Sequence, residues 1–264
     1  MPRARRRLGQ HFLADPRILA RIADALETGP ADTVLEIGPG PGGLTEALLA
    51  RAGRVVAIEK DTTLAGLLQE RFPTVEVIEG DALEIDWHRL VQPPFLIAGN
   101  IPYNITSPLL DKALIPPRPE RVVFLVQKEV AERVSAAAGT AAYGALSVGI
   151  QVVAKPERLF TVSSGAFQPR PKVDSAVLRL TPLAEPVVAE GEVEPFRRLV
   201  VGLFGFRRKQ LGRGLRELTG WEAERVEAAL ARAGIPATAR PETVAPPAFA
   251  TLLRALVDEG WPVR

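Results

Sequence analysis

The sequence predicts an α/β protein whose mostly parallel sheet is covered by helices on both faces, followed by a small all-helical C-terminal domain. Short, near-continuous apolar runs alternate with helical segments through the first half of the chain. Such runs are typical of parallel strands buried on both faces, and the alternation favours β-α-β connections. From Pro195 onward the pattern is helical, with no run that predicts a strand.

The first half reads as helices and strands in regular order. A segment at 18–26 is apolar on one helical face and ends near Gly29 and Pro30, which stop a helix. Strands and helices are then expected to alternate, with strands at 33–37, 54–58, 75–78, 95–98 and 122–126, and helices at 44–52 and 63–72.

The pattern changes after Tyr143. Residues 146–153 read as a helix running into a strand, and no periodicity separates the two. Residues 159–162 and 173–180 are extended on either side of a Ser-, Gly- and Pro-rich loop, which predicts an antiparallel hairpin closing the sheet. A Pro-containing linker follows, so a boundary is expected near residue 184, dividing the chain into domains 1–184 and 185–264.

Composition excludes several kinds of site. The 264 residues include no cysteine and two histidines, which excludes disulfides, thiolate zinc sites, cysteine nucleophiles and a His-rich metal site. No metal is expected. No apolar run approaches the roughly 18 residues of a membrane span, and the basic N-terminus lacks the apolar stretch of a secretory signal. A cytoplasmic monomer without membrane contact is the simplest expectation.

Basic residues are clustered, although the formal net charge is only +2. Four of the first seven residues are Arg, and residues 207–216 hold five basic residues and no acidic one. Local patches of this kind can neutralise phosphates on a nearly neutral protein, which makes Arg207, Arg208 and Lys209 candidate RNA-binding residues. The alternative is a set of solvated arginines in an arginine-rich chain.

A glycine-rich loop follows the first strand. Gly38 and Gly40 belong to a G-x-G-x-G pattern with prolines at the x positions, which stiffen the loop. Glycines let the backbone approach a ligand closely. Glu36 lies two residues before the first glycine, where a carboxylate could hold a ligand's ammonium group. A purely structural turn is the alternative.

Acidic residues end the next two strands. Glu59 lies 19 residues beyond Gly40, where its carboxylate could accept hydrogen bonds from a ribose diol. Asp81 could accept the exocyclic amine of a bound adenine, and the Ala82 N–H could reach its ring. Each acidic residue alone fits a solvated strand end, but their register with the glycine loop favours a nucleoside ligand.

Residues Asn100-Ile101-Pro102-Tyr103 end the fourth strand and indicate a reaction. The exocyclic amine of adenine is a poor nucleophile because its lone pair is delocalised into the ring. The Asn100 side-chain oxygen and the Ile101 carbonyl could bind its hydrogens and localise that lone pair. Pro102 fixes the turn, and Tyr103 offers a face on which an extruded base can stack. The alternative is a structural turn with a core tyrosine.

The loop from Phe167 to Val173 is rigid and basic. We expect an exposed Phe167 to sandwich the extruded base opposite Tyr103, with Arg170 and Lys172 on phosphates. A structural hairpin with one buried Phe is the alternative.

Several motifs together resemble the rRNA adenine N6,N6-dimethyltransferases over roughly residues 8–216. The similar segments occur in the same order as in that family: Gln10-His11-Phe12-Leu13, LEIGPGPGGLT from Leu35, Glu59-Lys60, Gly80-Asp81-Ala82, Asn100 to Ile105, Gln127 to Val130, and FQPRPKVDSAV from Phe167. The run from Phe206 to Leu211 also resembles the start of that family's helical domain.

The resemblance implies a Rossmann-like class I methyltransferase fold with a seven-stranded sheet and S-adenosylmethionine as cofactor. It implies the small-subunit enzyme, which dimethylates two adjacent adenines in a 3′-terminal hairpin of 16S rRNA, in the immature 30S subunit, during late assembly. Asn100, Ile101, Pro102, Tyr103 and Phe167 are the candidate catalytic residues. Candidate cofactor-binding residues are Gln10, His11, Leu13, Glu36, Gly38, Gly40, Glu59, Lys60, Asp81, Ala82 and Asn100.

The sequence departs from the family at His11, where Asn is frequent, and at 212–214, where an Asn-rich stretch is expected. Two alternatives stay open: a 23S rRNA methyltransferase of the macrolide-resistance type, and an inactive RNA-binding assembly factor with a relic pocket. A DNA adenine methyltransferase usually has two prolines after the Asn and a separate recognition domain. An NAD-dependent oxidoreductase would need an acid or base for hydride transfer, which nothing here supplies.

Overall fold

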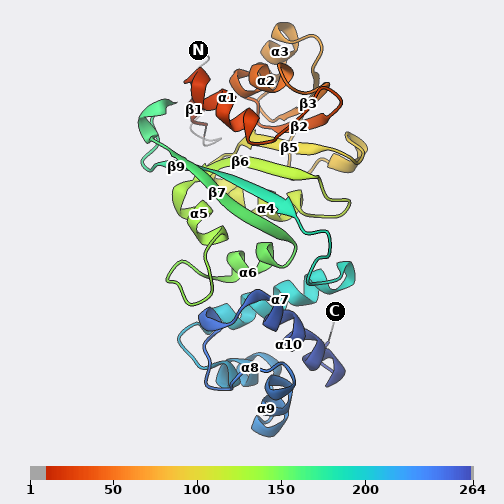
Figure 1. Cartoon of the computed structure of the whole chain (residues 1–264), viewed down its shortest axis with the longest axis vertical. Coiled ribbons are helices and arrows are strands. Elements are labelled where there is room, and N and C mark those ends of the chain that lie inside the picture. Colours follow the sequence, from red (N-terminus) through yellow and green to blue (C-terminus); the bar gives the residue numbers. More distant parts are fainter. Residues whose placement is uncertain (1–9, 263–264) are drawn as a thin grey trace. The chain divides into compact units, whose positions relative to one another are not determined.

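The computed structural model describes residues 10–262, so the arginines among the first seven residues lie outside the described part. The chain forms two compact units (Figure 1), which we call the sheet unit (up to residue 131, and 156–182) and the helical unit (132–155, and from 183). The boundary predicted near residue 184 lies close to residues 182 and 183, where the chain passes from the sheet unit into the helical unit for the last time. Residues 132–155, however, fold with the C-terminal helices, although the prediction placed them in the N-terminal domain.

A seven-stranded sheet forms the sheet unit in the order β4-β3-β2-β5-β6-β9-β7 (Figure 1). Its strands are β2 (Thr33–Ile37), β3 (Arg54–Glu59), β4 (Glu76–Glu79), β5 (Leu96–Asn100), β6 (Arg121–Gln127), β7 (Ala154–Val162) and β9 (Ser175–Pro182). β2 to β6 pair in parallel, and β9 is antiparallel to β6, with Phe124 opposite Leu178. The predicted mostly parallel sheet, closed by an antiparallel segment, is confirmed.

Helices cover the sheet because the apolar strands must be buried on both faces. The helices of this unit are α1 (Pro16–Asp24), α2 (Gly43–Leu49), α3 (Thr62–Arg71), α4 (Thr106–Ala113) and the start of α5 (Lys128–Val134). Leu19 and Ile22 of α1, Leu48 of α2 and Leu68 of α3 share one core cluster with Val34 and other alternate strand residues. Because β2 to β5 run parallel, their carboxyl ends meet at one edge of the sheet, and each leads into a loop there.

A second, two-stranded sheet joins β1 (Phe12–Leu13) to β8 (Phe167–Gln168), with Leu13 opposite Phe167. The sequence prediction made residues 163–172 a plain loop, whereas the structure has a 3-10 turn at Ser164–Ala166 and then β8. Strands of two residues have no periodicity to detect. Their pairing brings the N-terminal segment beside the loop before β9.

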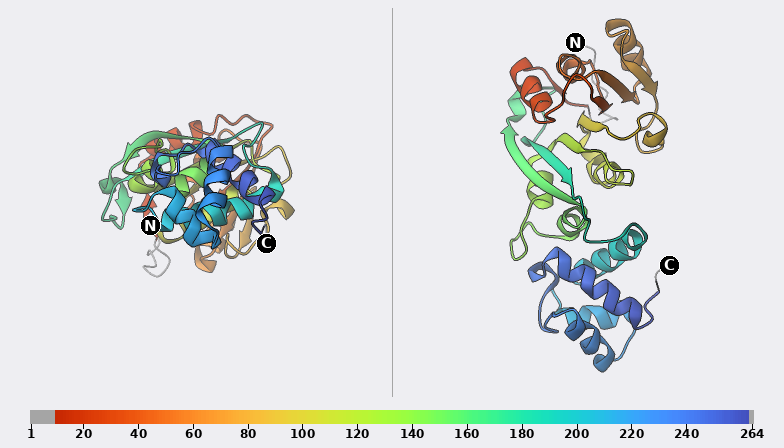
Figure 2. Two further views of the ribbon diagram at one scale, coloured as in Figure 1. Left: turned by 90° about the horizontal axis from the view of Figure 1, so that it is seen from below. Right: turned by 45° about the vertical axis from the view of Figure 1, so that its right-hand side comes forward.

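The helical unit (Figure 2) has its own core, which is rich in aromatic side chains. Its helices are α6 (Ala145–Gln151), α7 (Val193–Gly205), α8 (Leu211–Thr219), α9 (Ala223–Arg232) and α10 (Pro246–Asp258). Tyr143 is fully buried, and its hydroxyl donates to the Val244 carbonyl at 2.8 Å. Phe204 packs edge-on against Tyr143 and tilted against Phe249, both at 6.0 Å between ring centroids. None of the described helices is both long and apolar enough to cross a bilayer.

Candidate active site

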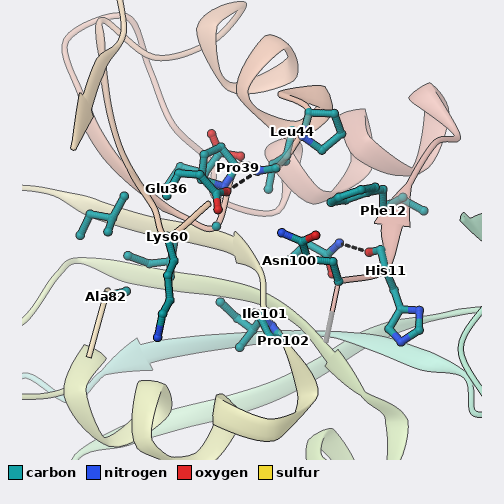
Figure 3. A pocket seen from close by; sticks show the side chains of 18 of the residues that line it. His11, Phe12, Glu36, Pro39, Leu44, Lys60, Ala82, Asn100, Ile101 and Pro102 are labelled. Carbon is teal, nitrogen blue, oxygen red and sulfur yellow. Dashed lines mark hydrogen bonds between the residues drawn. The ribbon is translucent and has the colours of Figure 1, made fainter. Parts of the chain in front are cut away.

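A cavity of about 190 Å³ opens at the carboxyl ends of β2, β3, β4 and β5 (Figure 3). Every cofactor-binding or catalytic candidate named from the sequence lines this cavity, with the exception of Phe167. The lining candidates are Gln10, His11, Leu13, Glu36, Gly38, Gly40, Glu59, Lys60, Asp81, Ala82, Asn100, Ile101, Pro102 and Tyr103. Segments that are far apart in sequence therefore converge as the strand order predicts.

The glycine loop needs glycine for conformation and for space. Gly40 and Gly42 have φ angles of +57° and +86°, in the left-handed region. A Cβ on Gly40 would lie 3.2 Å from the Phe12 ring, and one on Gly42 would lie 2.6 Å from the Phe72 ring. Side chains are therefore excluded here, and the backbone itself forms the wall of the cavity.

Glu59 ties this loop to the end of β3. The side chain is buried, and its two carboxylate oxygens accept the N–H groups of Gly40 at 2.9 Å and Asp61 at 2.8 Å. Burial raises the pKa of Glu59, and the two backbone hydrogen bonds oppose that shift. Each carboxylate oxygen has more than one lone-pair site, so the group can still accept the hydroxyls of a ribose.

Glu36 lies beneath the loop and is only 1% exposed. The Thr45 hydroxyl donates to its Oε2 at 2.6 Å. Burial raises the pKa of Glu36 to about 8, and the nearby Glu59 charge adds to the rise. Burial therefore favours the neutral form of Glu36 in the free protein, and the carboxyl group must lose its proton before it can form an ion pair with a ligand's ammonium group.

Asp81 follows β4 and is ionised. Lys60 lies 2.5 Å from its Oδ2, and the Leu83 N–H donates to its Oδ1 at 2.9 Å. The hydrogen bond from Lys60 is the largest cause of the lowered pKa of Asp81. An acceptor for an exocyclic amine is therefore present and charged, and Lys60 shares one of its oxygens.

Asn100 is oriented by the N-terminal segment. Its Nδ2 donates to the His11 carbonyl at 2.8 Å (Figure 3), across 89 residues of sequence. This bond uses the donor end of the amide and leaves Oδ1 as an acceptor. The next peptide is fixed as well, because the Ile101 N–H donates to the Leu125 carbonyl at 3.1 Å.

Tyr103 is held at its hydroxyl and on one face. The hydroxyl shares a 2.7 Å hydrogen bond with the buried Ser175, and burial raises the pKa of the phenol. The ring stacks on His11 with centroids 5.5 Å apart and planes inclined by 27°. His11 Nδ1 lies 2.8 Å from the Pro169 carbonyl. Tyr103 is therefore a fixed aromatic surface.

The expectation that Phe167 is exposed is wrong. Its side chain is 5% exposed, belongs to the core cluster with Leu13, and does not line the cavity. Because β8 pairs with β1, the Phe167 ring is buried in the sheet unit. The alternative of a structural hairpin with a buried Phe describes it correctly.

The proposed phosphate contacts lie at the surface and are exposed, except for the half-buried Lys209. Arg170 donates from Nε to Ser164 Oγ at 3.0 Å, and Lys172 is exposed in the same loop. In the helical unit, Arg207 donates to the Ala141 carbonyl at 2.9 Å, and Lys209 pairs with Glu217 at 2.9 Å. Their exposure is compatible with RNA binding but does not test it.

The sequence motifs did not reveal which side chains hydrogen-bond Glu36 and Tyr103. Thr45, which hydrogen-bonds Glu36, and Ser175, which hydrogen-bonds Tyr103, both lie inside motifs that were recognised. The Phe12 ring against Gly40 was also missed. A polar side chain at the start of a largely apolar run, such as Ser175 at the start of β9, is the signal that marks a hydrogen-bond partner of a site residue.

Comparison with known proteins decides the family. A model of the ribosomal RNA adenine dimethylase family matches residues 1–252. The chain belongs to this family. It is 45% identical to ribosomal RNA small subunit methyltransferase A of Geobacter metallireducens over 98% of this chain and 97% of that protein. It is 42% identical to the enzyme of the same name from Moorella thermoacetica over 96% and 92%. The chain is thus an rRNA adenine dimethyltransferase.

Solved structures have the same fold. The chain is similar to a dimethyladenosine transferase from Plasmodium falciparum, with a TM-score of 0.83 at 28% identity, over 95% of this chain and 98% of that one. It is also similar to the 23S rRNA methyltransferase ErmE, with a TM-score of 0.73 at 34% identity, over 93% and 99%. The Rossmann-like methyltransferase fold is confirmed.

Proposed function

We propose that this enzyme uses S-adenosylmethionine to dimethylate the N6 amines of two adjacent adenines in the 3′-terminal hairpin of 16S rRNA, within a partly assembled small subunit. The observation that carries the proposal is the turn from Asn100 to Tyr103, whose acceptors and aromatic face border a cavity with acidic groups. The names of the small-subunit relatives support 16S rRNA as the substrate.

The cavity fits the proposed cofactor. The glycine backbone forms a cradle that a Cβ would fill, Glu59 offers acceptors for a ribose diol, and Asp81 offers one for the adenine amine. Glu36, which also lines the cavity, would supply a counter-charge to the cofactor's ammonium group. When bound, S-adenosylmethionine supplies an activated methyl group on its sulfonium.

The enzyme's own residues would activate the target amine by accepting hydrogen bonds from its two N–H groups. Asn100 Oδ1 accepts one, because Nδ2 is already bound to the His11 carbonyl. The Ile101 carbonyl accepts the other, and Ile101 is held in place because its own N–H donates to the Leu125 carbonyl of β6. These two bonds pull the lone pair of the amine out of conjugation, and Tyr103 holds the base by stacking.

RNA would be bound by basic groups on both units. Arg170 and Lys172 of the sheet unit and Arg207, Arg208 and Lys209 of the helical unit are the proposed contacts with the phosphate backbone. Since backbone contacts carry little sequence information, selection of the two adenines would depend on the shape of the RNA and on its protein context. Action as a monomer in the cytoplasm stays a prediction.

One observation favours a second substrate. ErmE is 34% identical to this chain, and its name assigns it 23S rRNA. The deciding experiment is methyl transfer from labelled S-adenosylmethionine to undermethylated 30S subunits, with 50S subunits and duplex DNA alongside, mapped by nuclease digestion and mass spectrometry. Dimethyladenosine in 16S rRNA alone would support the proposal. Label in 23S rRNA would favour the resistance-type substrate instead.

A protein with a relic pocket would give no label in any substrate. Titration calorimetry with S-adenosylmethionine separates that case, since a relic pocket should bind the cofactor poorly. Tight binding without label on isolated 30S subunits would move the substrate to an earlier assembly intermediate, which the same mapping can test on precursor particles.

A further inference from the structure

The loop that follows β4, residues 81–86, is held by two residues that do not line the cavity. Trp87 Nε1 donates to the Ala82 carbonyl at 2.8 Å. Lys112, on α4, donates from Nζ to the Leu83 carbonyl at 2.8 Å and to the Ile85 carbonyl at 2.6 Å. Neither Trp87 nor Lys112 lines the cavity. Three carbonyls of one short loop are thus bound by side chains that do not line the cavity.

The same loop is also fixed internally. Asp81 accepts the Leu83 N–H at its carboxylate, and its carbonyl accepts the N–H groups of Glu84 at 2.9 Å and Ile85 at 3.0 Å. Gly80 has a φ of +156°, and a Cβ there would lie 2.8 Å from Ile85 Cδ1. With four of its carbonyls and three of its N–H groups bound, the loop has little freedom to shift.

The two outer residues also support each other. Lys112 Nζ lies 5.3 Å from the centre of the Trp87 ring, which is buried. Burial lowers the pKa of Lys112, and the charges of Asp86 and Asp81 oppose that shift. The Lys112 charge in turn helps to lower the pKa of Asp81. Lys112 therefore acts on Asp81 through both the loop backbone and its charge.

We propose that Lys112 and Trp87 are positioning residues that set the affinity and the base selectivity of the cofactor site. They do so by holding the loop that presents the Asp81 carboxylate and the Ala82 N–H to the adenine. This inference rests on the proposed cofactor. A site displaced by a fraction of an ångström loses the geometry that its hydrogen bonds need, even when every residue that touches the ligand is intact.

The test measures binding of two ligands to Lys112→Met and Trp87→Phe. S-adenosylhomocysteine has the adenine amine that Asp81 would accept, whereas S-inosylhomocysteine lacks it. Calorimetry should show that the unchanged enzyme prefers the adenosyl ligand. Each variant should bind that ligand roughly tenfold more weakly, the scale of one lost hydrogen bond to a charged group, and bind the inosyl ligand almost as before. The ratio of the two dissociation constants should therefore fall.

Arg118→Met is the matched control. Arg118 is also partly buried, and its Nε donates at 2.9 Å to the carbonyl of Leu114, the C-cap of α4, which is not part of the cofactor loop. Arg118→Met should leave the ratio of the two dissociation constants unchanged. The unfolding temperature of each variant is measured alongside. In methyl transfer, Lys112→Met and Trp87→Phe should raise KM for S-adenosylmethionine while kcat at saturation stays near that of the unchanged enzyme.

Unchanged affinity in both variants would overturn the inference, and so would equal weakening for both ligands with a constant ratio, because that result indicates general destabilisation. Trp87→Phe keeps an aromatic ring in the buried space, so it remains informative if Lys112→Met fails to fold. Failure of the unchanged enzyme to bind either ligand would instead refute the proposed cofactor, and this inference with it.

Discussion

At the scale of single residues, Glu36 combines two demands that conflict. It is buried with one hydrogen-bonding hydroxyl, Thr45, and it lies beside a second carboxylate, Glu59. A carboxyl group in such a place is stabilised in its neutral form. If a cationic ligand needs Glu36 to be ionised, the buried negative charge lowers the free energy of unfolding of the ligand-free enzyme.

The pH dependence of stability tests this conflict. The pKa of Glu36 is about 8 in the folded protein, against 4.5 for an unperturbed glutamate, so between these values only the folded protein holds the proton. The contribution of Glu36 to the free energy of unfolding should then fall by about 1 kcal/mol per pH unit as the pH rises from about 5 to 8. In Glu36→Gln that decline should flatten, leaving the smaller decline due to Glu59, and the protein should be more stable at pH 8. Urea unfolding at several pH values measures both curves. Parallel curves would show that Glu36 ionises freely.

Asn100 gives the residue-scale prediction for catalysis. Asn100→Ala removes the Oδ1 acceptor, which we expect to matter only when the amine becomes a nucleophile. Single-turnover methyl transfer should slow roughly 100-fold, the scale seen when one polar group that stabilises a transition state is removed. Binding of S-adenosylmethionine, measured by calorimetry, should be largely retained. Near-normal turnover would remove Asn100 from the mechanism, whereas loss of cofactor binding alone would make it a cofactor residue.

At the scale of elements, the turn between β2 and α2 requires glycine, while the glycine inside α3 has no such role. Gly42→Ala would force a Cβ to 2.6 Å from Phe72 at a φ of +86°, and should lower the free energy of unfolding by about 2 kcal/mol or more. Gly66→Ala meets nothing within 4 Å in the middle of α3, and should raise it by about 0.5–1 kcal/mol. Denaturant unfolding of the two variants compares them directly. Equal effects would show that space around Gly42 does not limit the loop.

Elements were predictable where periodicity was strong. The buried parallel strands β2, β3 and β5 begin and end within two residues of their predicted bounds, because each is a near-continuous apolar run ended by glycine or a polar group. The strands β1 and β8 have two residues each and exist only because they pair with each other. That pairing could not be read from either segment alone, and it is the reason why Phe167 is buried.

At the scale of the whole molecule, the lining of the site was predictable but its internal bonding was not. Parallel strands with one common edge guarantee that Glu59, Asp81 and Asn100 meet there. The bonds from Asn100 to His11 and from Tyr103 to Ser175 link residues 89 and 72 positions apart. They depend on how the N-terminal segment and β9 are placed, which no local pattern records.

RNA binding is the remaining property of the whole molecule, and the helical unit offers a direct test of it. Replacing Arg207, Arg208 and Lys209 together with Ala should weaken binding of 16S rRNA fragments. It should also reduce the slope of log affinity against log salt by about 0.7–0.9 for each phosphate that is no longer neutralised. Arg232→Ala is the control in the same unit, because Arg232 lies at the end of α9, outside the 207–209 cluster, and is paired with two carboxylates, Asp258 at 2.5 Å and Glu259 at 3.0 Å. Fluorescence anisotropy over a series of salt concentrations gives both quantities. An unchanged slope in the triple variant would place the RNA footprint elsewhere, whereas a slope reduced equally by Arg232→Ala would mean that overall charge, rather than this cluster, attracts the RNA.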